Sequence, residues 1–213
     1  MKNKAAVLST GLCLLPIALS ILLYNGLPER IAVHFDNAGT PDSYLPKALA
    51  AFGLPLLLAG VNLYAHFRLS ADPKVENSAA SLRILAKWLV PVVSLIIMPV
   101  TLFTAMGKNV PIVMIVTAIA GLAIVISGNY LPKCKRNYTI GIKLPWTLDD
   151  EENWNHTHRF SGFVWAAGGM LIIAGAFLEI PYLTAAVAAC LIILPVGYSY
   201  LFFLHHRDED RGE

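Results

Sequence analysis

The residue types in this chain that could do chemistry are concentrated in one polar segment, YTIGIKLPWTLDDEENWNHTHRFSG, at residues 138–162. Its carboxylates, imidazoles and one guanidinium are spaced so that several would gather near the start of one helix. They are Asp149, Glu152, His156, His158 and Arg159. Side chains of these types bind metal ions, phosphate headgroups and protein partners, so this segment is the candidate functional site.

Metal catalysis is the weaker interpretation of this segment. His156 and His158 are two residues apart, so on a helix they project about 200° from one another and cannot easily share one ion. The HExxH spacing of zinc enzymes is absent. We therefore expect no metal, no cofactor and no enzymatic activity. The alternative is a membrane-surface enzyme or lipid-handling protein that uses the same Asp/Glu/His motif.

Local signals predict the helix that would carry these side chains. Pro145 ends any regular element before it, and Thr147 stands as an N-cap before a run of acidic residues, which favour the first turn of a helix. That helix should run through Trp154 and His158 into the next apolar run. Trp146 and Trp154 also suit the aromatic belt of a membrane interface.

The composition around this segment is that of a membrane protein. Of 213 residues, 56% are hydrophobic and 14% are charged. A helix needs about twenty consecutive apolar residues to cross the hydrocarbon core. Six such runs occur, at residues 5–24, 48–67, 88–106, 110–131, 160–178 and 182–204. We expect an all-α membrane protein with six transmembrane helices, the first of which is a span rather than a cleaved signal peptide.

Lysine and arginine set the expected orientation. Counted loop by loop, 13 lie on one side of the six spans and 3 on the other. The positive-inside rule then places both termini in the cytoplasm (N-in/C-in), with the loop 132–159 inside and the segment 25–47 outside. No Asp, Glu, Lys or Arg falls within the six apolar runs, which disfavours a coupled ion transporter. No basic stripe suggests direct binding of nucleic acid.

Prolines and small residues mark the spans. Prolines lie in or at the ends of five of them, at Pro16, Pro55, Pro91, Pro99, Pro111, Pro181 and Pro195. Each removes a backbone donor, a loss that neighbouring helices or Ser/Thr hydroxyls can compensate, and both a static kinked bundle and a set of hinges fit the pattern. Gly162, Ala166 and Gly169 form a small-residue stripe that permits close helix contact.

The outer segment alternates between apolar and polar residues, which predicts a short strand over residues 30–36. A turn at residues 37–42 should follow it, because glycine and proline occur there. His34 and Asp36 would share one face of the strand, although two ligands make a weak metal site. The residues that we expect to face an extracellular ligand are His34, Asp36, Gly39, Pro41, Asp42 and Tyr44.

Two segments resemble a known family. The outer LPERIAVHFDNAGTPDSYLPK is similar to the small domain of unknown function that opens many SdpI-like proteins, and GIKLPWTLDDEENWNHTHRFSG resembles the signature of the SdpI family itself. The signature falls on Gly141, Ile142, Pro145, Trp146, Thr147, Leu148, Glu152, Trp154, Thr157, His158, Arg159, Phe160 and Gly162. We expect two parts: a two-helix unit at 1–70, which carries the extracellular segment 25–47, and a four-helix region at 71–213, which carries the motif loop 132–159.

The resemblance also implies a function. The best-known SdpI-family member is an immunity protein, so the chain is expected to confer resistance to a secreted peptide toxin and to hold a transcriptional repressor at the membrane. Its partners would be the lipid bilayer, the toxin and the repressor. The residues expected to bind a partner are Gly141, Pro145, Trp146, Thr147, Asp149, Glu152, Trp154, His156, His158 and Arg159. A passive membrane scaffold is a third hypothesis.

Overall fold

The computed structural model describes residues 2–36, 39–180 and 182–212, and six of its helical segments are long and apolar enough to cross a membrane. They are Lys4–Gly26, Leu49–Ala71, Ala80–Ala105, Ile112–Lys133, Glu151–Phe177 and Leu183–His206. Each overlaps one of the six predicted runs, so the mostly helical membrane fold is confirmed. Three of them also extend well beyond the predicted runs into polar sequence, because a helix continues wherever its backbone bonds are satisfied.

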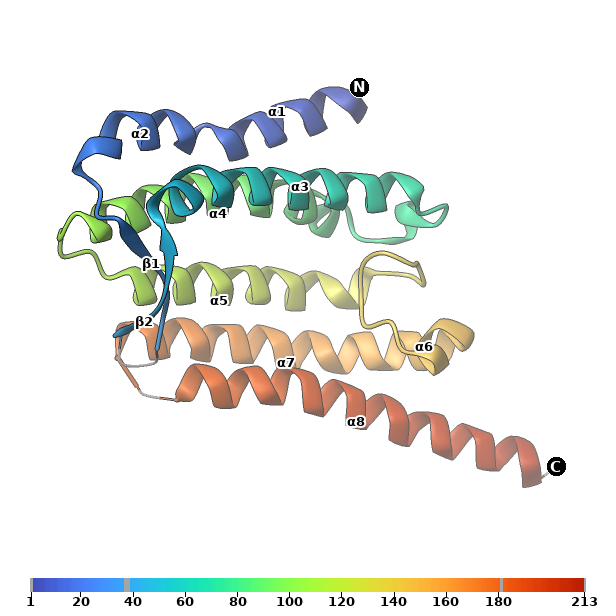
Figure 1. Cartoon of the computed structure of the whole chain (residues 1–213). Helices are drawn as coiled ribbons and strands as arrows, with labels where there is room; N and C mark the ends of the chain where they lie inside the picture. The colour runs from blue at the N-terminus through green and yellow to red at the C-terminus, as the bar shows by residue number, and fades with distance from the viewer. Residues whose placement is uncertain (1, 37–38, 181, 213) are drawn as a thin grey trace. The chain divides into compact units, whose positions relative to one another are not determined.

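Figure 1 shows the elements in chain order. They are α1 (Lys2–Leu14), α2 (Pro16–Leu23), β1 (Arg30–Phe35), β2 (Pro41–Pro46), α3 (Leu54–Ala71), α4 (Ala80–Ala105), α5 (Ile112–Tyr130), α6 (Pro145–Asp149), α7 (Glu151–Phe177) and α8 (Leu183–Gly212). The chain forms two compact units, and α3, α4 and α5 contribute to both. The first unit is Met1–Arg68 with Leu85–Ile119, and the second is Leu69–Ile84 with Ala120–Glu213.

A two-stranded antiparallel hairpin of β1 and β2 caps the core of the first unit. Ile31 of β1 is fully buried and packs with Leu27, Ala50, Ala51 and Leu102. The apolar face of the predicted strand, which carries Ile31 and Val33, is thus the face that packs on the helices. Burial of this face anchors the hairpin to the ends of the helices beneath it.

The second strand corrects the all-α prediction. Only one strand, followed by a turn over residues 37–42, was expected. In the structure Pro41 and Pro46 mark the two ends of β2, where proline is tolerated on an edge strand. The predicted turn includes Asn37 and Ala38, which lie outside the described residues. Gly39, just after them, has a φ of 78°, a conformation that glycine adopts without strain.

Two prolines of the first unit are compensated by side chains of other helices. Pro55 has no N–H to give to the carbonyl four residues before it, that of Ala51, in a short π-helix at Leu49–Gly53 (η2). The buried hydroxyl of Ser20 on α2 donates to that carbonyl at 2.9 Å. The bond therefore ties α2 to the start of α3 and satisfies a polar atom inside the apolar core.

Pro91 leaves the carbonyl of Lys87 without its helical donor in the same way. The fully buried Asn62 of α3 lies beside it: with the amide nitrogen turned to this carbonyl, at 3.1 Å, the amide oxygen accepts from Ser9 Oγ at 2.8 Å. Ser9 also lies 2.9 Å from His66 Nε2. This polar cluster links α1, α3 and α4, so the predicted compensation by neighbouring helices is confirmed here.

In the second unit, glycines bring α5 and α7 close together. A Cβ on Gly128 would lie 2.5 Å from the backbone nitrogen of Ala166 and 2.8 Å from the Gly162 carbonyl. A Cβ on Gly169 would lie 2.7 Å from the Gly121 carbonyl. The predicted stripe of small residues is therefore the contact surface of α7 for α5.

α7 and α8 run side by side in Figure 1 and pack along their lengths. Pro195 cannot donate to the carbonyl of Leu191, and the indole Nε1 of Trp165 on α7 donates to it instead, at 3.0 Å. This is the third helix carbonyl released by a proline that a neighbouring helix satisfies. A side chain with a donor at the right height thus replaces the missing backbone bond.

Candidate functional site

The loop between α5 and α6 is built around one buried asparagine. The Asn137 amide oxygen accepts from the backbone N–H groups of Thr139 and Ile140, at 3.0 and 2.8 Å, and its nitrogen donates to the Lys135 carbonyl at 3.0 Å. Asparagine favours such local turns because its side chain mimics a backbone group. A loop that lacks regular secondary structure is held in this way from its inside.

A second buried side chain, Asp72 after α3, ties this loop to the α3–α4 connection. Its carboxylate accepts from the N–H groups of Lys74 at 2.8 Å and Tyr138 at 3.0 Å. Burial raises the pKa of Asp72, but hydrogen bonds from Thr139, Lys74 and Tyr138 outweigh it and hold the pKa below its ordinary value. Asp72 is therefore a charged anchor for both loops at neutral pH.

Trp154 and His158 of α7 form the centre of the motif. Both are buried, and their rings stack with centroids 4.0 Å apart. The indole Nε1 donates to the Cys134 carbonyl at 2.8 Å. His158 Nε2 accepts the Ile142 N–H at 3.0 Å, so its proton lies on Nδ1, which donates to the Trp154 carbonyl at 2.7 Å. Both ring nitrogens are used, which leaves no lone pair for a ligand.

Gly141 explains why the motif carries a glycine next to this pair. Its φ is 127°, in the region that other residues rarely adopt. A Cβ there would lie 2.5 Å from His158 Nε2 and 2.9 Å from Trp154 Cη2. The backbone can approach the two rings only because the side chain is absent.

The start of the motif helix differs from the prediction. Thr147 is not the cap of α7: it lies inside the short helix α6, fully buried, and its hydroxyl accepts from Leu144 N–H at 2.9 Å and lies 2.9 Å from the Ile142 carbonyl. α7 is capped by Asp150, whose carboxylate accepts the Glu152 N–H at 2.8 Å. Asp150 is the N-cap because its extended backbone lets its side chain reach the first turn of α7.

Consequently, Asp149 does not lie on the same helix as Glu152, because Asp149 ends α6 and Glu152 is in the first turn of α7. The carbonyls of Leu148 and Asp149 are instead capped by Arg136, whose Nη1 donates to them at 3.0 and 2.9 Å. Arg136 therefore fastens the end of α6 to the preceding loop.

A buried polar seam joins the motif to α8. The Asn153 amide oxygen accepts from Thr157 Oγ1 and Ser199 Oγ, both at 2.9 Å, and its nitrogen donates to the Ser199 carbonyl at 3.1 Å. The indole of Trp146 donates to the same Ser199 hydroxyl at 2.9 Å. Sequence analysis missed Asn153 and Ser199. The available signal was a serine inside the last apolar run, opposite a polar helix face.

The remaining motif residues lie on the surface. Glu152 is between two imidazoles, with His206 Nε2 at 3.4 Å and His156 Nε2 at 4.0 Å. Glu152 and His156 therefore do gather near the start of one helix, as expected. The Phe202 ring stacks on both imidazoles, at 4.7 and 4.2 Å between centroids. This cluster connects the first turns of α7 with the far end of α8.

The five residues that sequence analysis grouped therefore separate into two sets. His158 is enclosed beside Trp154, which is also too deeply buried to serve in an aromatic belt. Asp149, Glu152, His156 and Arg159 are exposed. Within the described residues, no three His, Cys, Asp or Glu side chains gather closely enough to hold a metal ion. The exposed set presents two carboxylates, an imidazole and a guanidinium to solvent.

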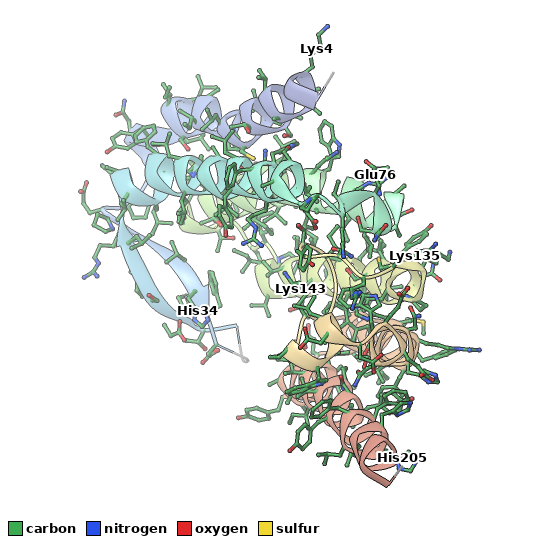
Figure 2. The ribbon with its side chains drawn as sticks, turned by 90° about the vertical axis from the view of Figure 1, so that its right-hand side faces the viewer. Lys4, His34, Glu76, Lys135, Lys143 and His205 are labelled. Atoms are coloured by element: carbon green, nitrogen blue, oxygen red, sulfur yellow. The ribbon has the colours of Figure 1, made fainter. Side chains whose placement is uncertain are left out.

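The hairpin presents its own polar residues. Figure 2 shows His34 on the hairpin, and its Nδ1 lies 2.6 Å from Asp42 Oδ1 across the two strands. The predicted pairing of His34 with Asp36 on one face is wrong, because the ladder is irregular on either side of His34 and the turn takes up Asp36. Asp36 Oδ1 accepts the Thr40 N–H at 2.8 Å instead.

The other hairpin residues expected to face a ligand lie along β2 or just before it. Pro41 begins β2 and is exposed, and Gly39 precedes it in the turn. Tyr44 lies opposite Ala32 in the ladder and is 44% exposed. A surface with one aromatic ring and several polar groups is suited to contact with a peptide.

Fold and site together define a multi-pass helical membrane protein with a polar motif folded into one of its two units. Residues 133–199 match the SdpI/YfhL protein family, and residues 11–59 match a domain of unknown function, DUF1648. Immunity protein SdpI of Bacillus subtilis (strain 168) is 27% identical over 209 residues, which cover 98% of this chain and 99% of that protein. No solved structure matches the chain.

Proposed function

We propose that this protein gives a cell immunity to a secreted peptide toxin. The observation that carries the proposal is its similarity to Immunity protein SdpI over almost the whole of both chains. The matched regions include both polar segments, since the hairpin falls within residues 11–59 and the motif within residues 133–199. A shared fold alone would not carry a function, so each segment needs a role of its own.

The distribution of lysine and arginine supports an orientation. With 13 of these residues on one side of the spans and 3 on the other, the hairpin faces outward and the motif faces the cytoplasm. A secreted toxin then meets the hairpin first. The proposed contact surface is the exposed part of β2, around Asp42 and Tyr44.

The acidic part of the exposed set, Asp149 and Glu152 together with His156, is the proposed contact for a cytoplasmic repressor. Glu152 and His156 project from the first turns of α7, where the helix dipole also favours negative charge. The buried set, centred on Trp154 and His158, holds that surface in shape. Toxin binding transmits a signal only if it distinguishes two arrangements of the spans, since a ligand shifts an equilibrium by its differential affinity alone.

The test is survival of toxin-sensitive bacteria that express this chain and are challenged with a peptide toxin of the SDP type. Because His158 is enclosed, loss of function in a His158 variant would not separate recognition from misfolding. The informative variants are exposed ones: Asp42→Asn and Tyr44→Ala on the hairpin, and Glu152→Gln and His156→Gln on the motif. Lys108→Gln, also exposed, is the matched control.

We expect the wild type and the control to protect the cells. The hairpin variants should lose protection at unchanged levels in the membrane. The motif variants should still protect but fail to recruit a repressor fused to a fluorescent reporter. Absence of protection from a correctly inserted wild type would overturn the immunity proposal. Hairpin variants that protect fully would overturn the role of β2.

A further inference from the structure

Three exposed cations of the second unit have no carboxylate partner within the described part of the chain: Lys133, Lys135 and Arg159. The other basic residues of this unit whose side chains the structure describes are occupied. Arg83 pairs with Glu76 at 3.0 Å, and Lys143 donates to the carbonyls of Tyr138 and Thr139. Arg136 caps α6, and Lys74 lies over the Tyr138 ring. A patch of unneutralised charge attracts an anion.

Contacts on either side of Lys133 place it along the same stretch of α7 as Arg159. The Cys134 carbonyl accepts a hydrogen bond from the Trp154 indole of α7. The Pro132 ring packs against Gly162 of α7 so closely that a Cβ on Gly162 would lie 2.5 Å from Pro132 Cγ. Arg159 lies between these two contact points on α7. Figure 2 shows Lys135 at the surface of the loop that continues from α5.

The depth of this patch matches the headgroup region of a bilayer. The span formed by α5 ends at Lys133, and the apolar stretch of α7 begins at Phe160, immediately after Arg159. Lys133 Nζ lies 4.5 Å from the centroid of the Tyr130 ring, the arrangement of an interfacial tyrosine beside a cation. The cations therefore sit where hydrocarbon gives way to phosphate.

The two carboxylates at the start of α7, Asp150 and Glu152, do not neutralise the patch. Glu152 is seven residues before Arg159, about 10 Å along the helix axis, and it faces His156 and His206. Asp150 is engaged as the cap of α7. The acidic and basic parts of this end of the molecule are therefore separated along α7.

We propose that Lys133, Lys135 and Arg159 bind the phosphate of an anionic phospholipid headgroup. A guanidinium can engage two phosphate oxygens at once, and the ammonium groups supply further charge-assisted bonds. This lipid would hold the loop after α5 against α7, next to the motif. The proposal concerns a different surface from the toxin and repressor contacts and stands whether or not those are found.

The experiment uses the full-length protein in detergent micelles, titrated with phosphatidylglycerol or phosphatidylcholine, with bound lipid counted by native mass spectrometry. We expect phosphatidylglycerol to bind and phosphatidylcholine to bind much more weakly. A cation near a charged headgroup contributes about a fivefold change in affinity. The double variant Lys133→Gln/Arg159→Gln should thus bind phosphatidylglycerol about 25-fold more weakly.

The matched control is Lys4→Gln/Lys108→Gln, which removes the same charge elsewhere and should bind as the wild type does. Circular dichroism and elution volume verify that each variant is folded, and Arg159→Lys should retain most of the affinity. Inorganic phosphate and glycerol 1-phosphate, added as competitors, distinguish a lipid site from a free-phosphate site. Equal lipid binding by the double variant and the control, or displacement of the lipid by millimolar phosphate, would overturn the proposal.

Discussion

The hairpin and the α7 motif contain similar residue types, yet they use them in opposite ways. In the hairpin, His34 and Asp42 pair on the surface, with 69% and 46% of their side chains exposed. In the motif, His158 is 1% exposed and both its nitrogens are bonded within the protein. One segment displays its polar groups to solvent, and the other uses them to fold a loop.

This difference teaches that a family signature need not be a binding site. Residues such as Gly141, Thr147 and Trp154 are explained by the packing of the motif alone. A buried polar group must have a hydrogen-bond partner, so a compact network of hydrogen bonds strongly limits which residue types can stand at each of its positions. The exposed residues around this network are the ones available to contact a partner.

The largest effect should come from Trp154→Ala. Removing a fully buried indole creates a cavity and orphans the Cys134 carbonyl, which should cost about 3–5 kcal/mol of unfolding free energy. Tyr44→Ala on the hairpin should cost under about 1 kcal/mol. Reversible denaturant unfolding in micelles measures both, and equal costs would erase the contrast between the two segments.

Gly141→Ala should destabilise by about 1–3 kcal/mol, because it combines an unfavourable φ with a clash against His158 and Trp154. The matched control is Gly60→Ala on α3, where a Cβ would meet nothing within 4 Å. That change should be neutral or slightly stabilising. The two melting temperatures should therefore move apart; a shared direction would contradict our interpretation of Gly141.

Trp165→Phe keeps most of the ring but removes the N–H that serves the Leu191 carbonyl, which should cost about 1–2 kcal/mol. In a Pro195→Ala background the backbone can supply that bond, so the same change should cost less than half as much. A double-mutant cycle measures this coupling. Additive costs would show that the indole does not replace the missing backbone donor.

Asp72, which anchors the loop before the motif, should make the stability of this buried region depend on pH. Its pKa in the folded protein is below the unfolded value of about 3.9, so its contribution is complete above about pH 4 and is lost as pH falls through the folded pKa. The melting temperatures of wild type and Asp72→Asn should differ by a constant amount from pH 5 to 8 and converge in acid. A gap that widens in acid would reverse the assigned sign.

The smallest effect should come from the hairpin pair. Asp42→Asn weakens an exposed contact between the Asp42 carboxylate and the His34 imidazole and should change the unfolding free energy by less than about 1 kcal/mol. The same melting experiment at low and high salt checks this. A larger loss would mean that the pair supports the hairpin itself, and the variant could then no longer report on toxin contact.

The sequence predicted what depends on local pattern. The six spans, the long helix through Trp154 and His158, and the small-residue stripe all follow from apolar length and helical spacing. It could not predict pairings between residues far apart, such as Asp72 with Tyr138 or Asn153 with Ser199. Where two caps compete, as Thr147 and Asp150 do, local propensity does not choose between them.

The released carbonyls also bear on how the helices find one another. Spans inserted separately into a bilayer would carry an unsatisfied carbonyl at Ala51 or Leu191, in a medium that offers no hydrogen bond. Only a neighbour with a donor at that height removes the penalty, so a mispaired bundle leaves it in place. Each proline therefore helps to specify which helix its span must meet during assembly, a selectivity that a continuous helix would lack.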